Sequence, residues 1–207
     1  MARKPDFDRA KVLGRAMSAF WEHGYEGTSL THLLATTGLS KSSLYAAFGD
    51  KHKIFLESYD LYRKQQAANL YTTLDSRPAP EGIRTFFEHI ITGGADQLQR
   101  FGCMSTNQAA ELGAQDGDVR ARVAEDYQLL ENAFTAHLLN GQKNGTVPQT
   151  ANVSAAASAL VTAFSGFQLT VRADMDRTRL RRSLDYLLSP LTISSEHSVA
   201  AANSKEA

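Results

Sequence analysis

The chain has 207 residues, 43% of them hydrophobic and 21% charged, and its 22 Lys and Arg balance 22 Asp and Glu. This length can bury roughly 70% of the unfolded surface, which is enough for one sizeable core or two small ones. No apolar run approaches the roughly 20 residues of a membrane span, and the N-terminus lacks the apolar core of a secretory signal. Neither a membrane-spanning nor a secreted protein is therefore expected.

Cysteine content and charge distribution indicate the cellular location and the kind of partner that the protein binds. A single cysteine leaves no internal disulfide, so a reducing, cytoplasmic location is expected, with no membrane partner. Residues 1–64 contain ten Lys and Arg against seven Asp and Glu, whereas the remainder has twelve against fifteen. A mildly basic head on a mildly acidic body suits nucleic acid at one end of the molecule only.

The first predicted helix covers residues 6–23 and ends at Gly24, a typical C-terminal signal. Residues 1–5 precede it as a short arm, whose Arg3 and Lys4 are either solvated or in contact with DNA phosphates. The apolar positions of this helix form one stripe that we expect in the core: Leu13, Ala16, Met17 and Phe20.

Residues 28–51 predict two short helices around one glycine turn. Thr28 is a good N-cap for the first helix, and apolar residues follow it at helical spacing. Gly38 ends that helix, because glycine adopts the positive φ of a sharp exit. Ser40 is the next N-cap candidate, and residues 41–48 form the second helix. Two helices joined by a short turn that contains glycine predict a helix-turn-helix.

The outer face of the second helix suits DNA. It carries no acidic residue, so it can enter a major groove about 12 Å wide without charge repulsion. The alternative interpretation is an ordinary helical hairpin with a solvated polar face. The residues of this face are Lys41, Ser42, Ser43, Tyr45 and Ala46.

Residues 9–62 resemble the DNA-binding region of the tetracycline-repressor (TetR) family. The resemblance rests on the run AMSAFWEHGYEGTSLTHLLATTGLSKSSLYAAFGDKHKIFLESY: a His-Gly-Tyr turn, Thr-Ser, Gly-Leu-Ser-Lys, Leu-Tyr-x-x-Phe and then a lysine that opens the fourth helix. Ala46 departs from the pattern, because many members have a bulky polar residue such as His there. A further segment, GCMSTNQAAELG, resembles a subgroup in which Gly-Cys opens helix six.

The resemblance implies a ligand-responsive transcriptional regulator that acts as a repressor, binds a palindromic double-stranded operator as a homodimer and is released by a small-molecule effector. Thr28, Lys41, Ser42 and Lys51 would then hold phosphates, and Ser43 and Tyr45 would reach phosphates or base edges. Lys51 also lies in the first turn of a helix, where backbone N–H groups favour an anion.

The body is predicted to be helical throughout, which gives an all-α protein of about nine helices: residues 51–74, 81–99, 103–112, 118–139, 152–172 and 176–188 follow the helix-turn-helix. A proline-rich break covers residues 76–80, and Asp118 is the expected cap of the helix that it opens. We expect a DNA-binding domain at residues 1–50, a ligand-binding and dimerisation domain at 51–193, and a disordered tail at 194–207.

The last two helices have features of a dimer interface. One stripe of the first is small throughout, which lets another helix approach closely, and the second has a leucine seam. A four-helix interface between two copies is expected, with intrachain core as the alternative. The predicted interface residues are Ala159, Ala163, Gly166, Thr170, Leu180, Leu184 and Leu187.

Catalytic and metal-binding patterns are missing from the sequence, so no enzyme, cofactor or metal site is expected. Pockets in helical bundles are mostly apolar with a few polar anchors. The predicted ligand-binding set is Tyr62, Phe87, Cys103, Met104, Asn107, Tyr127, Phe134 and Phe167, with Asn107 as a polar anchor.

Two alternative functions remain at this stage. Cys103 would lie in the first turn of a helix, whose dipole favours a reactive thiolate, and Arg100 would add to this effect. A thiol-based sensor of oxidants or electrophiles is therefore the first alternative, with a small buried hydrophobe as the structural interpretation of Cys103. The second is a helical small-molecule-binding module or enzyme without DNA function.

Overall fold

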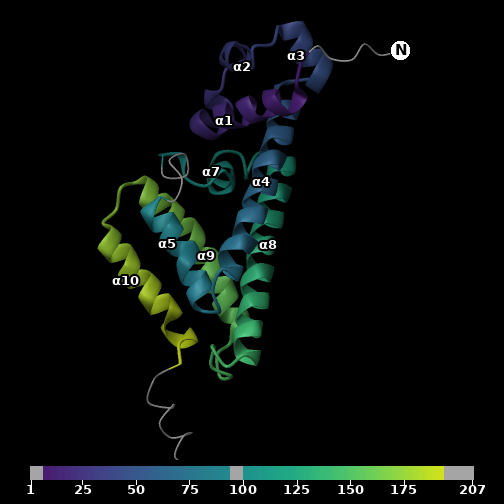
Figure 1. Ribbon diagram of the computed structural model, residues 1–207. Coiled ribbons are helices and arrows are strands. Elements are labelled where there is room, and N and C mark those ends of the chain that lie inside the picture. Colours follow the sequence, from purple (N-terminus) through teal and green to yellow (C-terminus); the bar gives the residue numbers. More distant parts are fainter. Residues whose placement is uncertain (1–6, 94–99, 194–207) are drawn as a thin grey trace, which may run out of the picture. The chain divides into compact units, whose positions relative to one another are not determined.

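A computed structural model describes residues 7–93 and 100–193 (Figure 1). Within these residues the chain forms nine α-helices and one short 3-10 helix, with no strand, which confirms the all-α prediction. The elements are α1 (Arg9–Gly27), α2 (Leu30–Thr37), α3 (Lys41–Phe48), α4 (Lys51–Asp75), α5 (Glu81–Thr92), α7 (Met104–Glu111), α8 (Gly117–Lys143), α9 (Val153–Arg172), α10 (Arg177–Leu188) and η1 (Ser189–Leu191).

The chain divides into two compact units. Unit 1 contains residues up to 68 together with 100–126, and unit 2 contains residues 69–99 together with those from 127 onward. Helices α4 and α8 therefore contribute residues to both units. This division differs from the predicted boundary after residue 50, because α7, most of α4 and the first turns of α8 group with the helix-turn-helix. The predicted basic arm and disordered tail lie outside the described residues.

Aromatic side chains from α1 and α4 fill the centre of unit 1. The rings of Phe20 and Phe55 lie edge to face with centroids 5.2 Å apart, and those of Trp21 and Tyr62 do the same at 5.0 Å. Such pairs contribute about 0.5–1.5 kcal/mol each beyond the area that they bury. At the start of α1 the buried residue is Val12, while the predicted Leu13 is only half-buried.

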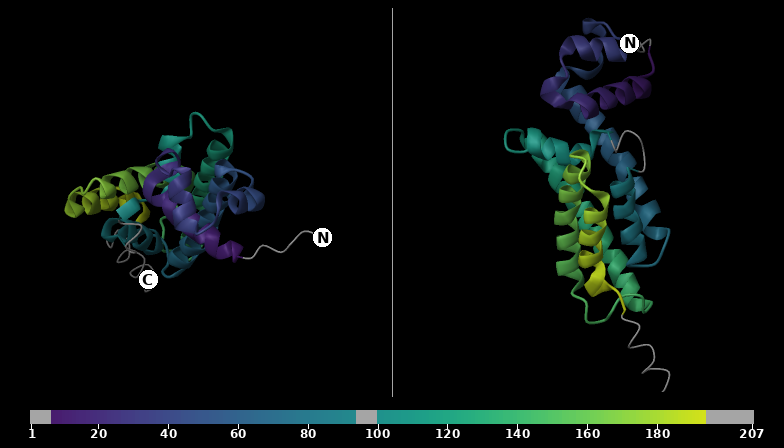
Figure 2. Two further views of the ribbon diagram at one scale, coloured as in Figure 1. Left: turned by 90° about the horizontal axis from the view of Figure 1, so that it is seen from above. Right: turned by 90° about the vertical axis from the view of Figure 1, so that its left-hand side faces the viewer.

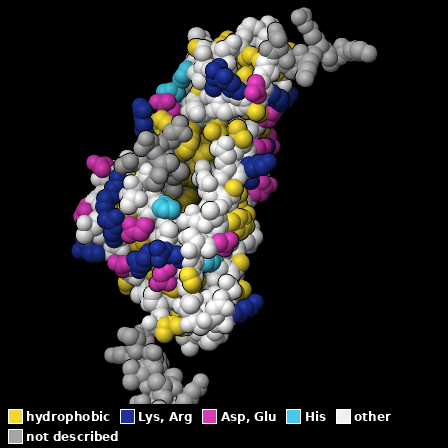
Figure 3. All heavy atoms as spheres, viewed as in Figure 1, with side chains coloured by type: hydrophobic (Ala, Val, Ile, Leu, Met, Phe, Trp, Pro, Cys, Tyr) yellow, Lys and Arg dark blue, Asp and Glu magenta, His cyan; other side chains and the backbone are white. Residues whose placement is uncertain are grey.

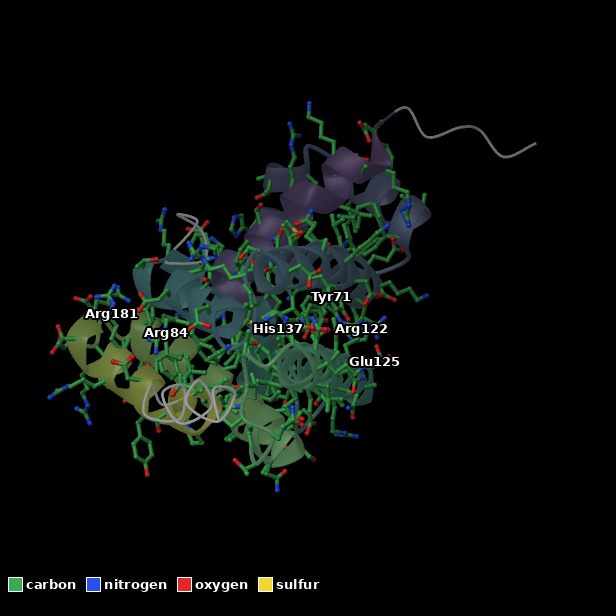
Figure 4. All side chains as sticks on the ribbon, turned by 60° about the horizontal axis from the view of Figure 1, so that its bottom comes forward. Tyr71, Arg84, Arg122, Glu125, His137 and Arg181 are labelled. Carbon is green, nitrogen blue, oxygen red and sulfur yellow. The ribbon has the colours of Figure 1, made fainter. Side chains whose placement is uncertain are left out.

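Phenylalanine rings from α5, α8 and α9 fill unit 2, in which α5, α9 and α10 pack side by side (Figure 2). The ring of Phe87 lies 6.2 Å from that of Phe134 and 5.1 Å from that of Phe167. Helices α5 and α10 are also joined by the ion pairs Arg84–Asp185 and Arg181–Glu88. Figure 3 shows basic and acidic side chains next to one another on this face, and Figure 4 labels the two arginines.

Several helix ends differ from the prediction: α1 runs from Arg9 to Gly27 across a kink at Gly24, and α8 extends to Lys143. Two further differences have a clear local cause. The cap of α8 is Asp116 and not Asp118, because Asp116 accepts hydrogen bonds from the backbone N–H groups of Asp118 and Val119. Although burial raises the pKa of Asp116, the hydrogen bonds from Val119 and His52 hold it below the usual value. Helix α5 ends at Thr92, because Gly93 adopts the left-handed conformation at φ 77°; the remainder of the predicted segment lies outside the described residues.

Contrary to the expectation from sequence that no apolar run reaches the length of a membrane span, helix α9 is long and apolar enough to cross a membrane by length and composition alone. Its apolar side is explained by packing, because its buried residues meet α5 and α10 inside unit 2. A core helix of a soluble protein has the same composition, so this helix does not indicate a membrane protein.

Candidate nucleic-acid interface

Serine side chains begin both helices of the helix-turn-helix. Ser29 caps α2 by accepting a hydrogen bond from the N–H of His32 at 3.1 Å, and Ser40 caps α3 by accepting one from Ser43 at 3.1 Å. Gly38 joins the helices in the left-handed conformation at φ 76°. These local signals fix the turn, and α3 has the predicted bounds of residues 41–48.

Thr28 is not the N-cap that the sequence predicted. Its side chain is fully buried, and its hydroxyl donates to the carbonyl of Gly24 at 2.7 Å. Ser29 takes the extended backbone conformation and becomes the cap. Thr28 and Ser29 are both suitable caps by residue type. Ser29 is the cap because Thr28 is buried against α1. Thr28 therefore stabilises the turn from inside and does not present its hydroxyl to a phosphate.

Helix α3 has one buried and one exposed side. Leu44 and Phe48 are 0% and 4% exposed and anchor the helix, while Lys41, Ser42 and Tyr45 are exposed on the other side. The ammonium group of Lys41 lies 5.8 Å from the centroid of the Tyr45 ring. This places a cation and an aromatic ring together on the face that sequence analysis assigned to DNA.

The serines of this helix form a small hydroxyl cluster. The Ser40 hydroxyl lies 3.0 Å from that of Ser42 and 2.8 Å from that of Ser43. From the sequence, Ser42 and Ser43 are predicted DNA contacts, and Ser40 is predicted only as a helix cap. Since hydroxyl groups can both donate and accept, the exposed members of the cluster can turn a proton towards a phosphate.

Lys51 lies over an aromatic ring that sequence analysis did not single out. Its ammonium group lies 4.3 Å from the centroid of the Tyr25 ring, within the range of a cation–π contact. Desolvation by burial raises the pKa of the Tyr25 hydroxyl, so the ring stays neutral at physiological pH. The neighbouring Lys53 is exposed and pairs with Asp50 at 3.8 Å. Two lysines therefore stand in the first turn of α4.

His52, Asp116 and Asp118 bring potential metal-ligand atoms within 4.8 Å of one another. Helix capping and ion pairing account for this arrangement. One Asp116 oxygen caps α8, and the other lies 2.6 Å from Nε2 of His52. The contact joins the first turn of α4 to the N-cap of α8 inside unit 1.

The predicted ligand-binding residues fall into two separate groups. Tyr62, Cys103, Met104 and Asn107 belong to unit 1, whereas Phe87, Tyr127, Phe134 and Phe167 belong to unit 2. In unit 1 the Tyr62 hydroxyl accepts a hydrogen bond from the N–H of Met104 at 3.1 Å. The Asn107 amide donates to the carbonyl of Phe101 at 2.8 Å. In unit 2 the Tyr127 hydroxyl accepts from Ser165 at 2.9 Å. In each unit three of the four residues are buried, while Asn107 and Tyr127 are half-buried.

Cys103 is buried, with 6% of its surface exposed, and it occupies the N-cap position of α7. Its side chain makes no capping hydrogen bond. Burial raises the pKa of the Tyr62 hydroxyl, and the neighbouring Cys103 raises it further. Arg100, which sequence analysis expected to activate the thiol, is exposed and pairs instead with Glu22 at 3.6 Å.

The predicted dimer residues differ in accessibility. Ala159 and Gly166 are exposed on α9, and Ala163, Thr170 and Leu187 are half-buried. Leu180 and Leu184 are 5% and 0% exposed within the subunit, so they are core residues of unit 2. The outer side of α10 instead has a shallow, open hollow, lined by Arg179, Arg182, Ser183, Tyr186 and Leu187.

The head thus combines a glycine-joined helix pair with an exposed acid-free face and two lysines at the start of the next helix. These features define a DNA-binding protein of the helix-turn-helix class.

Comparison with known proteins gives the family. Residues 12–58 match the model "Bacterial regulatory proteins, tetR family", and residues 79–187 match "Tetracyclin repressor-like, C-terminal domain". The HTH-type transcriptional regulator YezE of Bacillus subtilis is 31% identical over 92% of this chain and all of its own. The HTH-type transcriptional repressor ComR of Escherichia coli is 28% identical over 80% of each chain. The chain belongs to the TetR family, and it is a DNA-binding transcriptional regulator.

A solved structure supports the same fold. The TetR family transcriptional regulator CifR, as a cysteine mutant complexed with 26bp double-strand operator DNA, is 28% identical to this chain. The two align with a TM-score of 0.74, over 90% of this chain and 98% of the CifR chain.

Proposed function

We propose that this protein is a ligand-responsive, non-enzymatic repressor that works in the cytoplasm and binds a palindromic operator as a homodimer. The proposal rests on the exposed face of α3, which contains Lys41 and Tyr45, together with Lys51 at the start of the following helix, α4. The related protein ComR is named a transcriptional repressor, which supports repression over activation.

In the bound state α3 lies in the major groove. Tyr45 and Ser43 contact phosphates or base edges, while Lys41, Ser42 and Lys51 contact phosphates. The N-termini of α2 and α3 add backbone N–H groups, which favour phosphate oxygens. Two copies of α3 occupy successive major grooves about 34–36 Å apart, as half-sites of a dimeric helix-turn-helix protein require. Thr28 supports this surface from beneath.

The dimer forms through the outer faces of α9 and α10. The small residues Ala159, Ala163, Gly166 and Thr170 let a partner helix approach closely, and Leu187 adds an apolar contact. Tyr186 is 81% exposed in the single subunit, which is unusual for so large a ring and favours its burial by a second copy. Leu180 and Leu184 support this surface from inside the subunit.

A small-molecule effector releases the operator. Helix α4 runs without interruption from Lys51 to Asp75, so it links the phosphate-binding lysine to the part of the chain that belongs to unit 2. An effector shifts the DNA-binding equilibrium only by the difference between its affinities for the bound and released states. The two groups of residues that contain Tyr62 and Phe87 are the candidate contacts.

Replacing Lys51 by alanine is expected to weaken binding to all DNA sequences and to lower the salt slope of binding by about one unit, since one phosphate contact is lost. Fluorescence anisotropy at several salt concentrations measures this slope. Lys64→Ala is the matched control, because Lys64 is an exposed lysine on the same helix. An unchanged slope in Lys51→Ala would remove Lys51 from the phosphate contacts.

Cys103 supports a second candidate, a thiol-based sensor, because it begins α7 and neighbours Tyr62. Its burial slows any reaction with dissolved oxidants. Treatment of the native protein with iodoacetamide or hypochlorite, followed by mass spectrometry and a gel shift, tests the candidate. The repressor proposal expects Cys103 to stay unmodified and the operator to stay bound. Modification of Cys103 with loss of operator binding would favour the sensor.

A helical binding module without DNA function is the alternative from another class. Retention on heparin, followed by a gel shift on DNA from upstream of its own gene, separates the two. The repressor proposal expects a shifted band that resists excess unrelated DNA. A protein that elutes at low salt and shifts no DNA would support the alternative.

A further inference from the structure

Helix α7 lies next to α1, the helix that precedes the helix-turn-helix (Figure 1), and makes polar contacts with it. At its start, the indole N–H of Trp21 donates to the carbonyl of Gly102 at 2.7 Å. At its end, the carboxylate of Glu111 accepts two backbone hydrogen bonds from the last turn of α1, which follows a kink at Gly24. These come from Tyr25 at 3.1 Å and Glu26 at 2.8 Å, one to each carboxylate oxygen.

The turn is shaped for this carboxylate. Gly24 has φ 74°, a conformation that turns the next two N–H groups towards the same anion. A side chain at this position would collide with Glu111, because a Cβ there would lie 2.6 Å from a carboxylate oxygen. The amide of Gln108, which is 1% exposed, holds that same oxygen at 3.1 Å. Glu111 is therefore oriented by Gln108 of its own helix, and its carboxylate fits against Gly24 because glycine has no side chain.

Tyr25, which Glu111 holds by its backbone, also contacts the proposed phosphate-binding residue Lys51. The backbone N–H of Tyr25 bonds to Glu111, and the ring of Tyr25 lies under the ammonium group of Lys51 at 4.3 Å. The same ring lies 4.9 Å from that of Phe55, which fixes its plane. A displacement of Glu111 thus moves the surface on which Lys51 rests.

We infer that Glu111 is a positioning residue for DNA binding: it holds Tyr25 so that Lys51 is set against the operator backbone. This inference rests on the proposed role of Lys51 and extends it to α7, which is not among the proposed DNA contacts. It also gives a route by which a shift of α7 releases DNA, since the carboxylate is the link between α7 and the Lys51–Tyr25 pair.

A double-mutant cycle tests the inference. Glu111→Gln keeps the shape of the side chain but replaces one accepting oxygen with an NH₂ group, which cannot accept from an N–H. We expect it to weaken operator binding about fivefold to tenfold, within the usual range of coupling between sites. In a Lys51→Ala background the same change should cost less than about twofold, because the residue through which Glu111 acts is gone.

Glu26→Gln is the matched control, since it removes a neighbouring exposed charge and leaves the backbone contact intact. Glu111→Asp, which keeps the charge but is one methylene shorter, provides a second variant. We expect it to weaken binding as Glu111→Gln does, again only when Lys51 is present. Equal losses with and without Lys51, or operator affinity within twofold of the unmodified protein in both Glu111 variants, would overturn the inference.

Failure of the inference and failure of the proposed function are distinguishable. Hydrogen exchange of the Tyr25 and Glu26 amides needs no DNA: it should be slow in the unmodified protein and faster in Glu111→Gln. Fast exchange in the unmodified protein would overturn the inference alone. Absence of operator binding by the unmodified protein would overturn the proposed function.

Discussion

Replacing Leu44 by alanine is expected to unfold the helix-turn-helix at moderate temperature and to abolish operator binding. Leu44 is fully buried on the inner side of α3. A buried leucine truncated to alanine costs about 2–5 kcal/mol, because the transfer energy is lost and a cavity remains. Circular dichroism on heating and a gel shift measure the two effects.

Leu139→Ala is the control for this prediction, since Leu139 is 45% exposed on α8. We expect that change to alter the free energy of unfolding by less than about 0.5 kcal/mol, as most surface substitutions do. The dimer should survive in both variants, because its proposed surface belongs to unit 2. Operator affinity within twofold of the unmodified protein in Leu44→Ala would show that α3 is not held by this side chain.

Replacing Gly166 by arginine is expected to leave the subunit folded but to separate the dimer. A Cβ at Gly166 meets no atom within 4 Å in the single subunit. Inside a helix, most residues are also more favourable than glycine, by up to about 1 kcal/mol. A long charged side chain in the small stripe would instead prevent the close approach of a second α9. Sedimentation velocity at micromolar concentration measures the change.

Operator affinity should fall in the same variant. Two linked heads bind one operator with a gain of about 10²–10⁴ over a single head, and a monomer loses this gain. Ala136→Arg is the control, because Ala136 is an exposed small residue on α8 of the same unit. A Gly166→Arg protein that remains dimeric would place the interface away from this stripe.

Sequence alone predicted the head well because its signals are local. Gly38 and Ser40 fix a helix end and a helix start within three residues, so α3 was predicted with the observed bounds. The choice between Thr28 and Ser29 failed because both are good caps, and the burial of Thr28 against α1 decided between them. The cap of α8 was ambiguous for a similar reason, because Asp116 and Asp118 both precede the same apolar stripe. The structure has Asp116 as the cap.

The body was harder to predict because its contacts join distant residues. The leucine seam of α10 predicts an apolar face but not the helix that covers it, and Leu180 and Leu184 pack inside the subunit. The Glu111 contact joins residues 86 apart in sequence, and no local pattern marks it. Gly24 was predicted only as the C-terminal signal of the first helix, and that prediction does not point to a partner on α7.

The central claim is that two copies of this head bind two half-sites one helical repeat apart. Selection of bound DNA from a random duplex pool tests it most directly. We predict an enriched palindrome with half-site centres about 34–36 Å apart and two subunits on each duplex. A pool without enrichment, or an enriched single half-site bound by one subunit, would contradict the claim.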